Sequence, residues 1–219
     1  CRLIDSSMDF SSKNTSMHVT PDQSQAGQAY AEALHRLLPF HFFYEKAGLE
    51  LPDFTFLEGG EMPYPYRSLL VHTNDMTPTL AAFHHSKLYL EVHKHESNDE
   101  FVMRLVSLHA ASSNKPVEDG AIAIQLGGLP EDVRDEVIAG EKPRGGILGE
   151  YAVEHRGSPG AYFSVPADGF IANALGQESG DVLYGRCNQL LDREGVVFAD
   201  IVEILPRSNE SEKWVENVI

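Results

Sequence analysis

One arginine lies within an apolar strand pattern and is the first candidate for chemistry. In the segment 101–108, alternation places Arg104 in one row with Val102 and Val106. A guanidinium stays charged in proteins, and burying it without a partner is costly, so an anion should face it. That anion is either an internal carboxylate or a ligand carboxylate held by two parallel hydrogen bonds. At a sheet edge the side chain would instead reach water.

Two acidic residues occupy opposite faces of the strand expected over 196–205. Glu203 is in phase with one set of apolar residues, and Asp200 is in phase with the other. At least one of these carboxylates therefore lies on an apolar face. There it either pairs with a base such as Arg104 or Arg186, or it has a raised pKa and a chemical role.

Other reactive side chains do not complete a recognisable site. His93 and His95 point the same way on a strand, but no carboxylate or further histidine at ligand spacing completes a metal site. Cys187 is expected to be a packing residue. Gly145 and Gly146 do not belong to the glycine patterns of phosphate-binding loops. The sequence therefore predicts no metal site.

Short strands joined by turns make up most of the chain after residue 88. Alternation of apolar and polar residues predicts strands over 88–95, 101–108, 161–165, 182–191 and 196–205, and a turn at 112–115 leads into a further strand that contains 121–124. Helices are expected over 21–38, 76–83 and 129–140. Strands in series with few helices between them favour an antiparallel sheet with helices packed on one side, an α+β fold.

Composition restricts the class of protein. The 219 residues include 33 acidic and 17 basic side chains, a formal net charge of −16. Such charge disfavours nucleic acid as a partner, and no apolar run is long enough to span a bilayer. One domain is expected over 21–206, with a flexible arm over 1–20 and a polar tail over 207–219. We expect a cytoplasmic protein; a processed or lipid-anchored N-terminus at Cys1 is a second interpretation. Nothing in the sequence indicates an oligomeric state.

The order of several short segments resembles the chorismate pyruvate-lyase family, which is related to the effector-binding domain of GntR-type regulators. The segments are 69–80 (LLVHTNDMTPTL), 103–104 (MR), 143–148 (PRGGIL), 184–186 (YGR) and 203–206 (EILP). Together they cover roughly residues 65–206. The resemblance implies a chorismate lyase-like α+β fold.

The resemblance also implies a reaction. Chorismate, or a similar carboxylated ring, would lose pyruvate and become 4-hydroxybenzoate without a metal or organic cofactor. Arg104 would hold the ring carboxylate, and Glu203 would face the ring hydroxyl or ether oxygen as proton donor or hydrogen-bond acceptor. The family's acid lies one residue further from the final proline, so either a β-bulge redirects Glu203 or Asp200 takes its role.

The remaining residues implied by the resemblance would form the walls of the pocket. Met76 would line the apolar side, Gly145 would lie in the segment whose backbone lines the pocket, and Arg144 and Arg186 would add positive charge for a small-molecule carboxylate. The main prediction is thus a carbon–oxygen lyase. The alternative is a non-catalytic binder of a small aromatic carboxylate on the same fold. A different reaction, with Arg144 selecting another substrate, is a third possibility.

Overall fold

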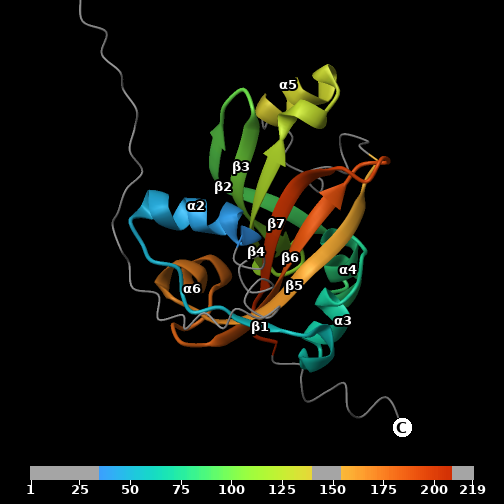
Figure 1. Ribbon diagram of the computed structural model, residues 1–219. Helices are drawn as coiled ribbons and strands as arrows, with labels where there is room; N and C mark the ends of the chain where they lie inside the picture. Colours follow the sequence, from blue (N-terminus) through green and yellow to red (C-terminus); the bar gives the residue numbers. More distant parts are fainter. Residues whose placement is uncertain (1–34, 140–153, 209–219) are drawn as a thin grey trace, which may run out of the picture.

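Seven antiparallel strands form one sheet in the computed structural model, which describes residues 35–139 and 154–208 (Figure 1). The strands lie in the order β1-β5-β6-β7-β4-β3-β2. Their bounds are β1 Thr55–Leu57, β2 Leu88–Ser97, β3 Phe101–Ala110, β4 Lys115–Gln125, β5 Arg156–Pro166, β6 Val182–Leu191 and β7 Val197–Leu205. The helices are α2 Leu38–Ala47, α3 Tyr66–Leu70, α4 Met76–Phe83, α5 Glu131–Ala139 and α6 Gly169–Leu175. The predicted α+β class with an antiparallel sheet is confirmed.

Helices cover both faces of the sheet, whereas the sequence predicted helices on one side. On one face α2 and α6 pack over a core that includes Phe40, Phe163 and Val202. On the other face α3 and α4 pack near Leu108 and Leu205 (Figure 1). The reason lies in the central strands, which are buried at consecutive positions and so present apolar side chains in both directions.

The chain around Pro39 differs from the sequence expectation. The helix predicted over 21–38 lies mostly outside the described residues, and Pro39 belongs to the first turn of the next helix, α2. Proline is tolerated there because the first amide groups of a helix have no intrahelical partner. The predicted arm over 1–20 and most of the tail over 207–219 also lie outside the described residues. No helix of the described ranges has both the length and the apolar character needed to cross a membrane.

The hairpin of β6 and β7 carries several side chains of the site. Its turn is closed by Asp192, whose Oδ1 accepts hydrogen bonds from the backbone N–H groups of Glu194 at 2.9 Å and Val196 at 2.8 Å. Gly195 follows with a φ of +84°, a conformation that favours glycine. The turn fixes the strand register, which pairs Arg186 with Glu203.

Two glycines bring the neighbouring strands unusually close to β7. Gly120 on β4 pairs with Glu203, and Gly185 on β6 pairs with Ile204. A Cβ on Gly120 would lie 2.4 Å from the carbonyl oxygen of Val202, and one on Gly185 would lie 2.4 Å from that of Glu203. The backbone that presents Glu203 is therefore held between two strands that have no room for a side chain at these points.

Candidate functional site

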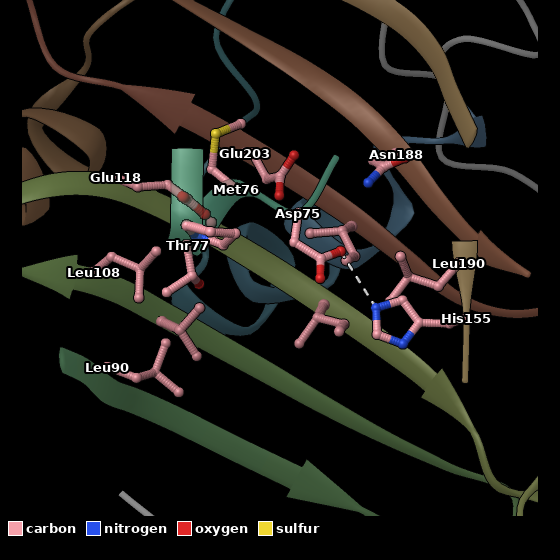
Figure 2. A pocket seen from close by; sticks show the side chains of 15 residues that line it. Asp75, Met76, Thr77, Leu90, Leu108, Glu118, His155, Asn188, Leu190 and Glu203 are labelled. Carbon is pink, nitrogen blue, oxygen red and sulfur yellow. Dashed lines mark hydrogen bonds and ion pairs between the residues drawn. The ribbon is translucent and has the colours of Figure 1, made fainter. Parts of the chain in front are cut away.

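A cavity of about 250 Å³ lies between the sheet and the first turn of α4 (Figure 2). Strands β2, β3, β4, β6 and β7 contribute its floor and sides. Its apolar wall consists of Met76, Pro78, Leu90, Val106, Leu108, Ile122, Leu190 and Ile201. Its polar side chains are Asp75, Thr77, Glu118, His155, Asn188 and Glu203. The cavity is thus mostly apolar with a few polar groups, as small-molecule sites are.

The start of α4 places acidic and polar groups at the cavity. Asp75 is the N-cap residue, but its side chain caps no backbone N–H of the helix. Its Oδ1 instead lies 3.3 Å from Nε2 of His155, just before β5 (Figure 2). Thr79 Oγ1 donates to the carbonyl oxygen of Asp75 at 2.9 Å, which holds this turn in place. Asp75 is therefore directed across the cavity.

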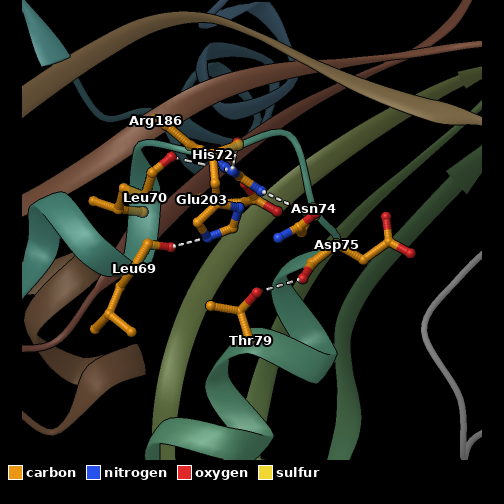
Figure 3. A network of polar contacts seen from close by, with 8 residues as sticks. All are labelled: Leu69, Leu70, His72, Asn74, Asp75, Thr79, Arg186 and Glu203. Atoms are coloured by element: carbon orange, nitrogen blue, oxygen red, sulfur yellow. Dashed lines mark hydrogen bonds and ion pairs between the residues drawn. The ribbon is translucent and has the colours of Figure 1, made fainter.

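A buried ion pair supports the floor of the cavity (Figure 3). Arg186 is fully buried, and its Nε donates to Oε2 of Glu203. Its Nη1 donates to the carbonyl oxygens of Leu70 at 3.1 Å and His72 at 2.8 Å. Its Nη2 donates to the carbonyl oxygen of Asn74 at 3.3 Å. One guanidinium thus orients Glu203 and fixes the segment that leads from α3 into α4.

His72 lies in this network as a neutral side chain. Its pKa is lowered, first by burial and then by the positive charge of Arg186. Its Nε2 lies 2.7 Å from the carbonyl oxygen of Leu69, so this nitrogen carries the proton and donates (Figure 3). The imidazole consequently adds no positive charge beside Glu203.

Glu118 is a second buried acid at the cavity, and its environment favours the protonated form. The residue is 7% exposed, and its Oε2 has no hydrogen-bond partner among the described residues. Burial raises its pKa well above the ordinary value. The negative charges of Glu203 and Asp119 raise the pKa further, while the charge of Arg186 opposes them. Glu118 and Glu203 therefore differ: burial favours the protonated form of the first, and an arginine holds the second.

The neighbouring acid, Asp119, points to the opposite face of β4. It is fully buried, and neither carboxylate oxygen has a hydrogen-bond partner in the described ranges. Burial raises its pKa well above the ordinary value, and the backbone N–H of Gly120 lowers it less strongly. Since adjacent strand residues face opposite ways, Asp119 does not reach the cavity.

Two of the predicted site residues, Glu203 and Met76, line the cavity. Asp200 lies on the other face of β7, where its Oδ1 accepts a hydrogen bond from Nε2 of Gln189 at 2.9 Å. Of the two acids considered for one role, Glu203 is thus the one that faces the cavity. Arg144 and Gly145 lie outside the described residues, so their predicted roles stay predictions.

The two predicted arginines of the sheet lie away from the cavity lining. Arg186 lies behind Glu203 and donates its hydrogen bonds to Glu203 and to backbone carbonyl oxygens. Arg104 is 4% exposed, and its Nη2 donates to the carbonyl oxygen of Val137 in the last turn of α5. Carbonyl groups at a helix C-terminus favour a nearby cation. The predicted contact of Arg104 with a ligand carboxylate remains a prediction.

Sequence reasoning missed five of the six polar residues of the cavity, namely Asp75, Thr77, Glu118, His155 and Asn188. Glu118 was missed because only 121–124 were recognised within this strand, which in the structure begins at 115 and puts Glu118 in one row with Ile122. Asn188 is in phase with Leu190 on β6, and this alternation was a usable signal. Asp75 and His155 meet across 80 positions of sequence, and no local pattern predicts that contact.

Comparisons with known proteins find distant structural similarity only. No protein-family model matches the sequence, and none of the curated proteins matches it. The ligand-binding domain of a GntR-family transcriptional regulator from Bordetella bronchiseptica is 15% identical, with 55% of this chain and 86% of that chain covered and a TM-score of 0.42. The effector domain of PhnF from Mycobacterium smegmatis is 10% identical, with 60% and 87% covered and a TM-score of 0.45.

The effector-binding domain of the trehalose repressor from Bacillus subtilis is a third similar structure. It is 12% identical, with 53% of this chain and 89% of that chain covered and a TM-score of 0.33. All three are effector- or ligand-binding domains, and none of the three is a chorismate lyase. Similarities of this extent do not show a function, so the cavity is the better guide to what the chain binds.

Proposed function

We propose that this chain binds a small molecule in the cavity between α4 and the sheet and does not transform it. The observation that carries the proposal is the cavity itself, about 250 Å³ in volume, with an apolar wall and polar groups gathered on β4, β6 and β7. Small-molecule sites are concave and mainly apolar, with a few polar groups that orient the ligand. The buried ion pair with Arg186 keeps Glu203 in position before a ligand arrives.

Binding without reaction is favoured over elimination of pyruvate from chorismate because of the charges at the cavity. Chorismate is a dianion, and a lyase must hold both of its carboxylates. The described lining contains Asp75, Glu118 and Glu203 but no lysine or arginine. A small aromatic carboxylate, the ligand of the alternative sequence prediction, meets the same acids. To bind chorismate or an aromatic carboxylate, the cavity would need a cation such as Arg144, which lies outside the described residues.

One observation keeps the lyase as a second candidate. Glu203 and Met76, the acid and the apolar residue implied by the family resemblance, both line the cavity. The oxygen atoms of Glu203 lie beside a fixed guanidinium, as a group that must stay oriented during a reaction would. The two candidates differ in a product, pyruvate, which makes them easy to distinguish.

The binding proposal is tested by filling the cavity. Thr77 lies in the first turn of α4 at the cavity, and Ala82 is exposed on the same helix away from it. We expect Thr77→Trp to block the cavity and Ala82→Trp to leave it open. Compact ring compounds with acidic, neutral and basic substituents should include one that raises the melting temperature of the wild type and of Ala82→Trp but not of Thr77→Trp. Equal stabilisation of both variants, or of none of the three proteins, would contradict binding in this cavity.

Incubation with chorismate separates binding from catalysis. We expect no release of pyruvate above the spontaneous rate, measured by a coupled assay. Release by the wild type that is lost in Glu203→Gln, with the folded variant confirmed by circular dichroism, would establish the lyase and overturn the proposal of binding without reaction.

A further inference from the structure

We infer that the cavity takes an organic cation: a compact apolar body that carries a protonated primary amine, with the ammonium group facing Glu118 and Glu203. The inference rests on the small-molecule binding proposed above and specifies the chemical class of the ligand. It follows from the positions of three polar side chains, from their unused acceptor atoms, from the charge of the lining and from its apolar wall.

Strand register places Glu118 and Asn188 on opposite diagonals of Glu203. Gly120 is directly opposite Glu203, so Glu118, two residues along β4, is a diagonal neighbour of Glu203 on the same face. Arg186 is directly opposite Glu203 on the other side, so Asn188 on β6 is a second diagonal neighbour. Diagonal neighbours in a sheet are about 7–8 Å apart, within reach of long side chains. Figure 2 shows Glu118 and Glu203 directed toward the same end of the cavity.

Two of these side chains have acceptor atoms without a donor. Oε2 of Glu118 and Oδ1 of Asn188 are buried and have no hydrogen-bond partner among the described residues. The two residues are 7% and 5% exposed, and both line the cavity. Buried acceptors are costly unless a donor reaches them, so a ligand that donates hydrogen bonds fits beside Glu203, with Glu118 on one side and Asn188 on the other. An ammonium group has three donors and no acceptor.

The charges of the lining select a cation among possible donors. The lining presents three carboxyl groups, and within the described residues no lysine or arginine faces the cavity. Arg186 is already bonded to Glu203 and to backbone carbonyl groups. In the described part of the chain the carboxyl groups are not grouped closely enough to hold a metal ion. The positive charge is therefore best supplied by an organic group.

The wall of the cavity indicates what carries the ammonium group. Opposite the acids, the lining is formed by aliphatic side chains, including Leu90, Val106 and Ile122. A sugar or another polyol would leave its hydroxyl groups against these side chains without partners. A hydrocarbon body with a single amine packs against the aliphatic wall and places its ammonium group at the acids. When it binds, Glu118 releases its proton to solvent and pairs with the ammonium group.

Three probes of one shape and different charge test the inference on the full chain. Benzylamine, benzyl alcohol and benzoate present a cation, a neutral donor and an anion on the same ring, and isothermal titration calorimetry at pH 7 measures their affinities. We expect benzylamine to bind most tightly, benzyl alcohol more weakly and benzoate not measurably. At pH values below the raised pKa of Glu118, benzylamine should also release protons on binding, seen as a dependence of the measured heat on the buffer used.

A matched pair of variants locates the ammonium group. Glu118→Gln removes the titratable carboxyl group at the cavity, and Glu178→Gln removes an exposed carboxyl group away from it. We expect Glu118→Gln to weaken benzylamine by about tenfold or more, to change benzyl alcohol by less than about twofold and to abolish the proton release. Glu178→Gln should bind like the wild type. Both variants retain the side-chain volume, so a loss of fold is not expected from either.

The outcomes separate this inference from the binding proposal. If benzyl alcohol or benzoate binds as tightly as benzylamine, the ligand is not selected for positive charge and the inference is wrong, while small-molecule binding stands. If Glu118→Gln and the wild type bind benzylamine equally, the ammonium group lies elsewhere and the inference is also wrong. If none of the probes binds, the inference fails, and if no compound of the earlier ring panel binds either, the binding proposal fails with it.

Discussion

Arg186 joins Glu203 to the segment between α3 and α4, and its charge has no route to water. Replacing it by methionine keeps an unbranched side chain but leaves Glu203 buried without its cation and three carbonyl groups without their donor. Breaking a buried ion pair from one side costs about 3–5 kcal/mol. We therefore expect Arg186→Met to lower the free energy of unfolding by that amount, measured by urea denaturation.

A surface arginine provides the control for this prediction. Arg193 is paired with Glu154, but its side chain is 75% exposed, and such pairs contribute about 0–1 kcal/mol. Arg193→Met should therefore unfold at nearly the same urea concentration as the wild type. If the two variants lose similar stability, the network around Arg186 does not support the site as described.

Glu118 makes stability depend on pH in an unusual direction. Burial raises its pKa above the ordinary value of 4.5, so above this pH the folded state holds a proton that the unfolded chain has lost. The free energy of unfolding then falls as the pH rises, until the raised pKa is passed, by at most about 1.4 kcal/mol per pH unit for one proton. Asp119 adds the same trend from its ordinary value of 3.8 upward.

A variant isolates the part of this trend that belongs to Glu118. The charged or titratable groups near it are Glu203 and Arg186, with Asp119 on the opposite face of β4 and with Asp75, His155 and His72 around the cavity. Glu118→Gln removes the proton that Glu118 contributes to the difference in bound protons between the folded and unfolded states. Its unfolding free energy should therefore fall less steeply with pH than that of the wild type. Urea denaturation at several pH values measures both slopes, and Glu178→Gln should retain the wild-type slope. Parallel curves for Glu118→Gln and the wild type would show that Glu118 is ionised in the folded protein.

At the scale of the strands, the close approach of β4 to β7 depends on Gly120. A Cβ there would lie 2.4 Å from the carbonyl oxygen of Val202, a backbone atom that moves only with its strand. Gly120→Ala should therefore lower the free energy of unfolding by about 1–3 kcal/mol and displace Glu203, its partner in the register. Chemical denaturation measures the first effect, and weaker binding in the cavity reports the second.

Gly169 is the matched glycine for this experiment. It is the first residue of α6, and a Cβ on it would meet no atom within 4 Å. Gly169→Ala should change the free energy of unfolding by less than about 1 kcal/mol, because alanine also suits a helix better than glycine does. A Gly120→Ala variant as stable as Gly169→Ala would show that the two strands can separate without cost.

The strands were easier to predict from the sequence than the faces of the sheet on which the helices pack. Alternation located β2, β3, β6 and β7 within a few residues, because polar and apolar side chains face different surroundings along each strand. The placement of helices on both faces was missed, since it follows from consecutive buried positions in β3 and β4 and no local rule assigns a helix to a face. Within β4 alternation identified only 121–124, because Glu118, Asp119 and Gly120 do not resemble a strand.

The candidate site was predictable only where one strand was sufficient to define it. Glu203 stands out as an acid in an apolar row, and the structure places it at the cavity. Its partner could not be chosen from the sequence, because the register of β6 and β7 pairs it with Arg186, while Arg104 lies two strands away and contacts α5. The contact of Asp75 with His155 depends on the folding of the whole sheet.

The whole molecule carries far more negative than positive charge, and this affects both its ligand and its stability. The formal net charge is −16 at pH 7, and the sequence pI is near 4.9. A field of this sign attracts cations to the surface and repels dianions such as chorismate, in line with the acidic lining of the cavity. The same charge repels itself most strongly when the chain is folded, because the folded state is the more compact one.

Salt should therefore stabilise the folded state at neutral pH. Raising the ionic strength from 0.01 M to 0.15 M shortens the screening length from about 30 Å to about 8 Å, which weakens repulsion across the molecule. At pH 7 we expect sodium chloride to raise the melting temperature by about 2–4 °C, as about 1 kcal/mol would in a protein of this size. Near pH 4.9 the net charge vanishes and the same salt step should have little effect. Equal shifts at both pH values would mean that the salt acts through ion binding or through the hydrophobic effect, and that self-repulsion does not limit the stability of this protein.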